Sequence, residues 1–149
     1  MAPQLADFIG DWRLAREIVQ ADGMVAQFTG QARFTPLGAG RLRYHETGRL
    51  CLPGAAPMQA ERSYLWAAEG EGAGEEGAGE EIAVFFADGR PFHRFSPGAP
   101  GATPEAAHLC PPDHYRVAYD FRHWPSWSAH WQVAGPRKAY SLTSRYCRA

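Results

Sequence analysis

The feature that most constrains this sequence is a period-two alternation of apolar and polar residues, repeated in short runs along the chain. In residues 26–34, for example, small or apolar side chains occupy the even positions and polar side chains occupy the odd ones. Successive side chains of a β-strand point to opposite faces of its sheet, so this spacing is typical of strands with one buried face. The apolar spacing of an amphipathic helix is nearly absent. The sequence therefore predicts an all-β protein.

Glycine and proline residues divide the chain into about nine or ten such runs. The predicted strands cover residues 8–20, 26–34, 41–52, 59–67, 82–86, 90–95, 105–110, 115–121, 127–134 and 138–148. A length of 149 residues suits one domain. An antiparallel meander of this size loses both unpaired edges when it closes into a barrel, and Gly30 and Gly48 suit the bends that closure requires. A sandwich of two sheets is the alternative.

Residues 68–81 depart from the alternation and read AEGEGAGEEGAGEE, with six glutamates, no basic residue and no large side chain. A segment of this composition cannot bury enough apolar area to offset the entropy of ordering it. We therefore expect a mobile loop within a single domain of residues 1–149. Without these six charges the chain has 10 acidic and 15 basic residues, a surplus of five positive charges in the expected body of the domain.

Composition and charge argue against several classes of protein. A net charge of -1 lacks the basic excess of a general nucleic-acid or anionic-membrane binder. No run approaches the roughly 18 apolar residues of a membrane-spanning helix, and residues 1–10 do not resemble a secretory signal. Cys51, Cys110 and Cys147 are far apart and odd in number. We therefore expect free thiols, a cytoplasmic location, and neither a nucleic-acid nor a membrane partner.

A Gly-x-Trp motif occupies residues 10–12, near the start of the first predicted strand. It resembles the signature of the lipocalins and of the wider calycin group of eight- to ten-stranded barrels. The resemblance implies that Trp12 plugs the closed end of the barrel and that an arginine of the last strand packs across it. Arg148 or Arg145 could supply that arginine.

A longer set of motifs is similar to a family of short bacterial lipocalin-like proteins catalogued only as a domain of unknown function. The set includes Trp12-Arg13-Leu14, Tyr44-His45-Glu46-Thr47-Gly48, Arg62-Ser63-Tyr64, Asp88-Gly89-Arg90, His108-Leu109-Cys110, Gly135-Pro136-Arg137-Lys138 and Ser144-Arg145-Tyr146. The similarity spans nearly the whole chain, although the acidic insert departs from it. It implies a fold and assigns no activity.

The alternation also carries polar residues onto the inner face of the expected barrel. The candidate binding residues, some of which depend on strand register, are Arg16, Tyr44, Glu46, Arg62, Tyr64, His93, His108, Trp131, Lys138, Tyr140 and Tyr146. Charged side chains are rarely buried without partners, so two arginines and one glutamate predict a polar lumen. A guanidinium group matches a carboxylate or phosphate through two parallel hydrogen bonds. We predict that Arg16 and Arg62 hold a small anionic molecule, carboxylate- or phosphate-bearing and with or without an aromatic ring.

Three other interpretations stay open. The charged residues and tyrosines could form a self-satisfied network that only stabilises the barrel. Glu46 or His93 could transfer protons in a lyase or isomerase, as the similar residue types of calycin barrels that decarboxylate phenolic acids suggest. A packed interior would instead leave a protein-interaction module that uses the outer wall or residues 123–127.

The sequence predicts neither a metal nor a cofactor. The histidines lack the spacing of a zinc site, and the inner face is too polar for haem. Whether the chain forms a homodimer is left open.

Overall fold

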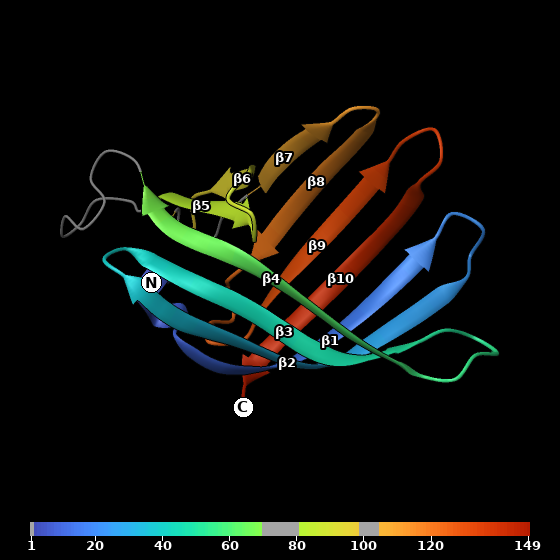
Figure 1. Cartoon of the computed structure of the whole chain (residues 1–149), viewed down its shortest axis with the longest axis horizontal. Coiled ribbons are helices and arrows are strands. Elements are labelled where there is room, and N and C mark those ends of the chain that lie inside the picture. Colours follow the sequence, from blue (N-terminus) through green and yellow to red (C-terminus); the bar gives the residue numbers. More distant parts are fainter. Residues whose placement is uncertain (1, 70–80, 99–104) are drawn as a thin grey trace.

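The computed structural model describes residues 2–69, 81–98 and 105–149, in which one short 3-10 helix and ten β-strands are found (Figure 1). The 3-10 helix η1 covers Leu5–Phe8. The strands are β1 Gly10–Gln20, β2 Val25–Gly38, β3 Arg41–Cys51, β4 Met58–Glu69, β5 Glu81–Phe86, β6 Pro91–Phe95, β7 Glu105–Cys110, β8 Asp113–Asp120, β9 Trp127–Ala134 and β10 Ala139–Arg148. The all-β prediction is confirmed, and the predicted strands differ from these only at their ends.

All ten strands belong to one antiparallel sheet, in the order β6-β5-β4-β3-β2-β1-β10-β9-β8-β7. Neighbours follow one another in the chain except for β1 and β10, which bring the first and last strands together. The sheet curls until its edge strands β6 and β7 come close, and no hydrogen-bonded ladder joins these two in the described part of the chain. The result is a single, nearly closed barrel, as predicted, and not a two-sheet sandwich.

The predicted acidic loop differs from the structure at both of its ends. Strand β4 continues through Glu69 and β5 begins at Glu81, because Ala68 pairs with Ile82 and Glu69 pairs with Glu81. Burial of Ile82 in the core favours this extension of the ladder. Residues 70–80, the greater part of the predicted loop, lie outside the described residues. In those that are described, no helix is long and apolar enough to cross a membrane.

One end of the barrel is closed by an aromatic plug around η1. We predicted that the first strand begins at Phe8, but residues 5–8 form η1, whose start is capped by a hydrogen bond from the Gln4 N–H to Asp7 Oδ2 at 2.7 Å. Phe8 is fully buried and packs edge-on against Trp127 at 5.3 Å between ring centroids. A ring this deeply buried contributes about 1.5–3 kcal/mol to folding.

The arginine that the lipocalin resemblance assigned to the closed end is Arg148. Its guanidinium carbon lies 3.8 Å from the centroid of the Trp12 ring, a cation–π contact. The same side chain donates hydrogen bonds to the backbone carbonyls of Ile9 and Asp7, while Trp12 Nε1 donates to the carbonyl of Phe8 at 2.9 Å. These bonds tie β10, η1 and β1 together at the closed end.

Strands β2 and β3 approach each other closely at two glycines, for which we predicted positions on the inner face. Gly30 and Gly48 are direct partners. A Cβ atom added to Gly30 would lie 2.0 Å from the carbonyl oxygen of Thr47. Only glycine allows the two backbones to approach this closely.

Candidate functional site

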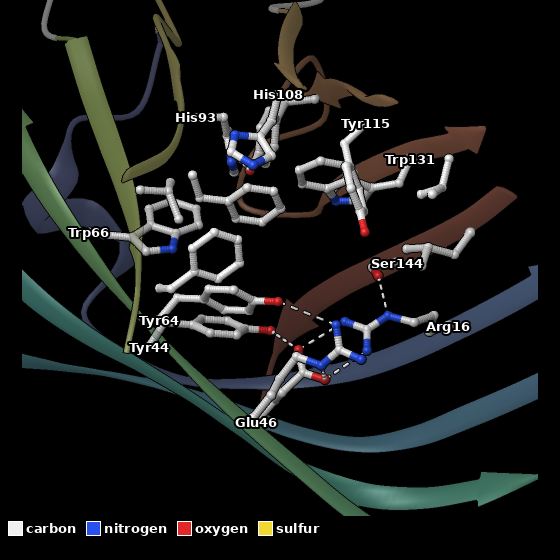
Figure 2. A pocket seen from close by; sticks show the side chains of 18 of the residues that line it. Arg16, Tyr44, Glu46, Tyr64, Trp66, His93, His108, Tyr115, Trp131 and Ser144 are labelled. Carbon is white, nitrogen blue, oxygen red and sulfur yellow. Dashed lines mark hydrogen bonds and ion pairs between the residues drawn. The ribbon is translucent and has the colours of Figure 1, made fainter. Parts of the chain in front are cut away.

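A cavity of about 270 Å³ lies inside the barrel (Figure 2). Trp66, Trp127 and Tyr146 line it on the side of the plug. Ten of the eleven residues predicted to bind a ligand line this cavity: Arg16, Tyr44, Glu46, Arg62, Tyr64, His93, His108, Trp131, Tyr140 and Tyr146. Whether they bind a ligand is not tested by their position and stays a prediction.

Lys138 is the exception and does not line the cavity. Strand β10 begins one residue later, at Ala139, so Lys138 lies in the exposed turn after β9 instead of on the inner face. Its Nζ lies 3.4 Å from both Asp113 Oδ2 and the hydroxyl of Tyr115. Tyr115 does line the cavity, so Lys138 contacts the cavity wall only from outside.

A buried ion pair between Arg16 on β1 and Glu46 on β3 forms the centre of the site (Figure 2). Nη1 and Nη2 of Arg16 donate to the two carboxylate oxygens of Glu46 at 2.7 and 2.9 Å, and Nε donates to Ser144 Oγ at 2.6 Å. Only 7% of the Arg16 side chain and 2% of the Glu46 side chain are exposed. Strand β2 lies between them, with Phe28 opposite Arg16 and Ala32 opposite Glu46. Gly30, midway between Phe28 and Ala32 along β2, has no side chain in the path from Arg16 to Glu46.

Two tyrosine hydroxyls extend this network. The hydroxyl of Tyr44 donates to Glu46 Oε1 at 2.6 Å and lies 2.8 Å from the hydroxyl of Tyr146. Burial raises the pKa of Tyr44 well above its usual value and that of Tyr146 to about 12. Both tyrosines are therefore neutral near pH 7 and act as hydrogen-bonding groups.

The protonation of Glu46 is decided by a balance of burial and pairing. Burial alone would raise its pKa, but the hydrogen bonds and charge of Arg16, together with the hydrogen bond from Tyr44 and the charge of Arg62, outweigh burial and hold the pKa below its usual value. Burial likewise acts to lower the pKa of Arg16, and the bonds to Glu46 reverse that effect. Glu46 is thus an anion whose oxygens are already occupied, which makes it a poor proton acceptor.

Arg62 adds a second positive charge at the edge of this network. The pairing of β3 with β4 sets Arg62 opposite Glu46 and Tyr64 opposite Tyr44, so the four side chains are neighbours, as expected from the alternation. Nε of Arg62 lies 3.7 Å from Glu46 Oε2, and Nη1 donates to the Tyr64 hydroxyl at 3.3 Å. Its side chain is 53% exposed. Two guanidinium groups therefore share one carboxylate, and Arg62 retains donors that these contacts do not use.

The opposite wall of the cavity contains two histidines, His93 on β6 and His108 on β7 (Figure 2). His93 is buried, with Nε2 2.8 Å from the hydroxyl of Tyr119, and its Nδ1 has no hydrogen-bond partner in the described part of the chain. Burial, with a smaller effect from the charge of His108, lowers the pKa of His93 to about 3. His93 is therefore neutral near pH 7.

Several lining residues were absent from the predicted site. The main ones are Phe86, Phe92, Cys110, Tyr115, Tyr119 and Ser144. Alternation along β8 could have found Tyr115 and Tyr119, since they share a face with buried Val117. Phe92 could not be found in this way, because an irregularity in the pairing of β5 with β6 turns it inward.

In residues 2–69, 81–98 and 105–149, no group of three or more His, Cys, Asp or Glu side chains is arranged to hold a metal ion. The three cysteines are exposed and unpaired.

Comparison with known proteins identifies the family. The model of DUF6314, a family of unknown function, matches residues 8–148. The chain belongs to the DUF6314 family. The expected assignment to a family without a known activity is thereby confirmed. No curated protein matches the sequence of this DUF6314 chain.

A solved structure shares the fold of this DUF6314 protein. The S-type phycobiliprotein lyase CPES from Guillardia theta superposes with a TM-score of 0.69 at 10% identity, covering 100% of this chain and 93% of the lyase. A redesigned barrel, mFAP1 bound to DFHBI, has a TM-score of 0.42 at 13% identity, with 95% of this chain and 94% of that one covered. The similarity to the lyase shows a common barrel fold.

Proposed function

We propose that this DUF6314 protein binds a small anionic molecule in its barrel cavity, with Arg62 as the group that receives the carboxylate or phosphate. The observation that carries the proposal is the excess of guanidinium groups over carboxylates. Glu46 satisfies Arg16 through two short hydrogen bonds, whereas Arg62 meets Glu46 only at 3.7 Å. An anion at Arg62 would supply the missing partner.

The two arginines then have different roles. Arg16 is buried and bound on three sides, so it positions Glu46 and Ser144 and need not contact the ligand. Arg62 is half exposed and lines the cavity, so an incoming anion can reach it without breaking the buried pair. A cavity of about 270 Å³ is slightly smaller than the usual range for ligand pockets, about 300–1,000 Å³, which favours a small metabolite.

The alternatives have less support. Proton transfer by Glu46 would require a free oxygen and a pKa nearer to neutrality, and its pairing with Arg16 opposes both. A neutral His93 with a pKa of about 3 is a weak base. A protein-interaction module with a packed interior does not account for the cavity. A cytoplasmic location remains a prediction that the unpaired cysteines support, and a homodimer stays open.

A thermal-shift screen with matched ligands tests the proposal. Small carboxylates and phosphate esters are compared with their neutral amides and alcohols, for the wild type and for Arg62→Met. An anion at 100 times its dissociation constant should stabilise the wild type by about 2.7 kcal/mol, and Arg62→Met should lose this gain.

The matched control is Arg49→Met, because Arg49 is an exposed arginine at an outward-facing position of β3 that does not line the cavity. It removes the same charge without touching the site, so its response to anions should equal that of the wild type. Equal loss in both variants would mean that net charge alone attracts the anions, and the proposal would be wrong.

A further inference from the structure

The side chain of Phe92 occupies the cavity because β6 contains a bulge. Val84 pairs with His93, but Phe85 pairs with Pro91, which leaves Phe92 as one extra residue in β6. In a regular strand Phe92 and His93 would point to opposite faces, whereas both line the cavity. Bulges characteristically redirect a side chain in this way. The bulge therefore adds to the cavity an aromatic ring that the alternation would have kept outside.

The ring of Phe92 lies between other flat rings. It stacks on Phe86 at 4.5 Å between centroids and 22° between planes, and on Trp131 at 5.0 Å and 11°. Tyr64 stacks on it more distantly, at 5.8 Å and 23°. No ring contact joins Phe86 directly to Trp131 within the described ranges, so Phe92 bridges two separate walls of the cavity.

Phe92 is also the ring in this stack with the least fixed backbone. It belongs to edge strand β6, which has β5 as its hydrogen-bonded neighbour and no ladder to β7 in the described residues. Trp131, by contrast, lies on β9, which is paired on both sides, by β8 and β10. Phe92 is partly buried and packs against the core. A rotation of Phe92 would open a flat slot whose remaining walls stay in position.

We propose that Phe92 occupies the position that a planar aromatic ring of the ligand takes in the complex. When the ligand binds, its ring displaces the side chain of Phe92 and stacks on Trp131. The inference rests on the proposed function, because the acid group of the same molecule would contact Arg62. Tyr64 connects the two subsites, because its hydroxyl accepts the hydrogen bond of Arg62 and its ring stacks on Phe92. The ligand class is thereby narrowed to small aromatic acids or aryl phosphates.

Benzoate and cyclohexanecarboxylate provide the test, since they have the same charge and similar size but only benzoate is flat. Dissociation constants are measured by calorimetry for the wild type, Phe92→Ala and Phe85→Ala. Phe85 is the matched control because it is on the neighbouring strand and does not line the cavity. Aromatic stacking should make benzoate bind about two- to tenfold more tightly than cyclohexanecarboxylate once Phe92 is removed. Phe85→Ala should leave the wild-type ratio unchanged.

The outcomes separate this inference from the proposed function. Equal Arg62-dependent binding of both acids to Phe92→Ala overturns the aromatic slot and leaves anion binding intact. If neither acid binds to the wild type or to any variant, anion binding is overturned and the slot with it.

A second measurement does not depend on the folding of Phe92→Ala. In the wild-type protein, nuclear Overhauser contacts between the rings of Phe92 and Trp131 should weaken as benzoate saturates the site, and benzoate-to-Trp131 contacts should replace them. Persistence of the Phe92-to-Trp131 contacts in the benzoate complex would make Phe92 a fixed wall and contradict the inference.

Discussion

Replacing either cavity arginine by methionine should separate a structural guanidinium from a binding one. Arg16→Met removes both hydrogen bonds to a carboxylate that is only 2% exposed, so Glu46 is left as a buried charge without its main partner. Breaking one side of such a pair costs about 3–5 kcal/mol. Arg62 is half exposed and 3.7 Å from Glu46, so Arg62→Met should cost only about 0–1 kcal/mol.

Urea denaturation followed by tryptophan fluorescence at pH 7 measures both effects. For a chain of this size, the loss in Arg16→Met corresponds to a fall of roughly 6–20 °C in Tm. Arg16→Met combined with Glu46→Gln should be more stable than Arg16→Met alone, because the second change removes the unpaired charge. Equal losses of stability in Arg16→Met and Arg62→Met would refute this division of roles, as would a double variant no more stable than Arg16→Met.

Three further predictions concern other parts of the barrel. The pKa of His93 is about 3 in the folded chain and about 6.5 in an unfolded one, so the unfolded chain binds a proton first as the pH falls. Acidification from pH 6.5 should therefore lower the free energy of unfolding by about 1.4 kcal/mol per pH unit relative to His93→Gln, measured by urea denaturation at each pH. Parallel curves for the two proteins would contradict the burial of His93. Gly30→Ala should destabilise the barrel by about 1–3 kcal/mol in the same assay, because the added Cβ atom would meet the backbone of Thr47. An unchanged urea midpoint would mean that β2 and β3 do not approach each other so closely. Arg148→Ala should lower the free energy of unfolding by about 1–2 kcal/mol, because it removes the cation–π contact with Trp12 and the hydrogen bonds to two backbone carbonyls. An unchanged free energy of unfolding would show that the closed end of the barrel does not depend on Arg148.

Much of the fold could be predicted because one face of each strand is buried. A one-residue shift in register would move every inner side chain to the outside, so alternation fixes the register wherever it is strong. On β3 and β4 the alternation alone predicts that Tyr44, Glu46, Arg62 and Tyr64 are neighbours, and the pairing of the two strands confirms it. The strand count follows from the same pattern.

The remaining features depend on contacts between distant parts of the chain. The 3-10 helix at residues 5–8 carries no alternation, and its stability comes from the burial of Phe8 among rings of other strands. The bulge at Phe92 appears only when β5 and β6 pair. The separate roles of Arg16 and Arg62 could not be distinguished from sequence either, because they are set by which arginine reaches both oxygens of Glu46.

An anion that binds at Arg62 should leave the Arg16–Glu46 pair intact, and the guanidinium NMR signals of the two arginines report on both. During a titration with benzoate, the Nε signal of Arg62 should shift and saturate, while the Nε signal of Arg16 stays in place and remains protected from exchange by its bond to Ser144. An Arg62 signal that does not move while benzoate binds, or an Arg16 signal that loses its protection, would contradict the account.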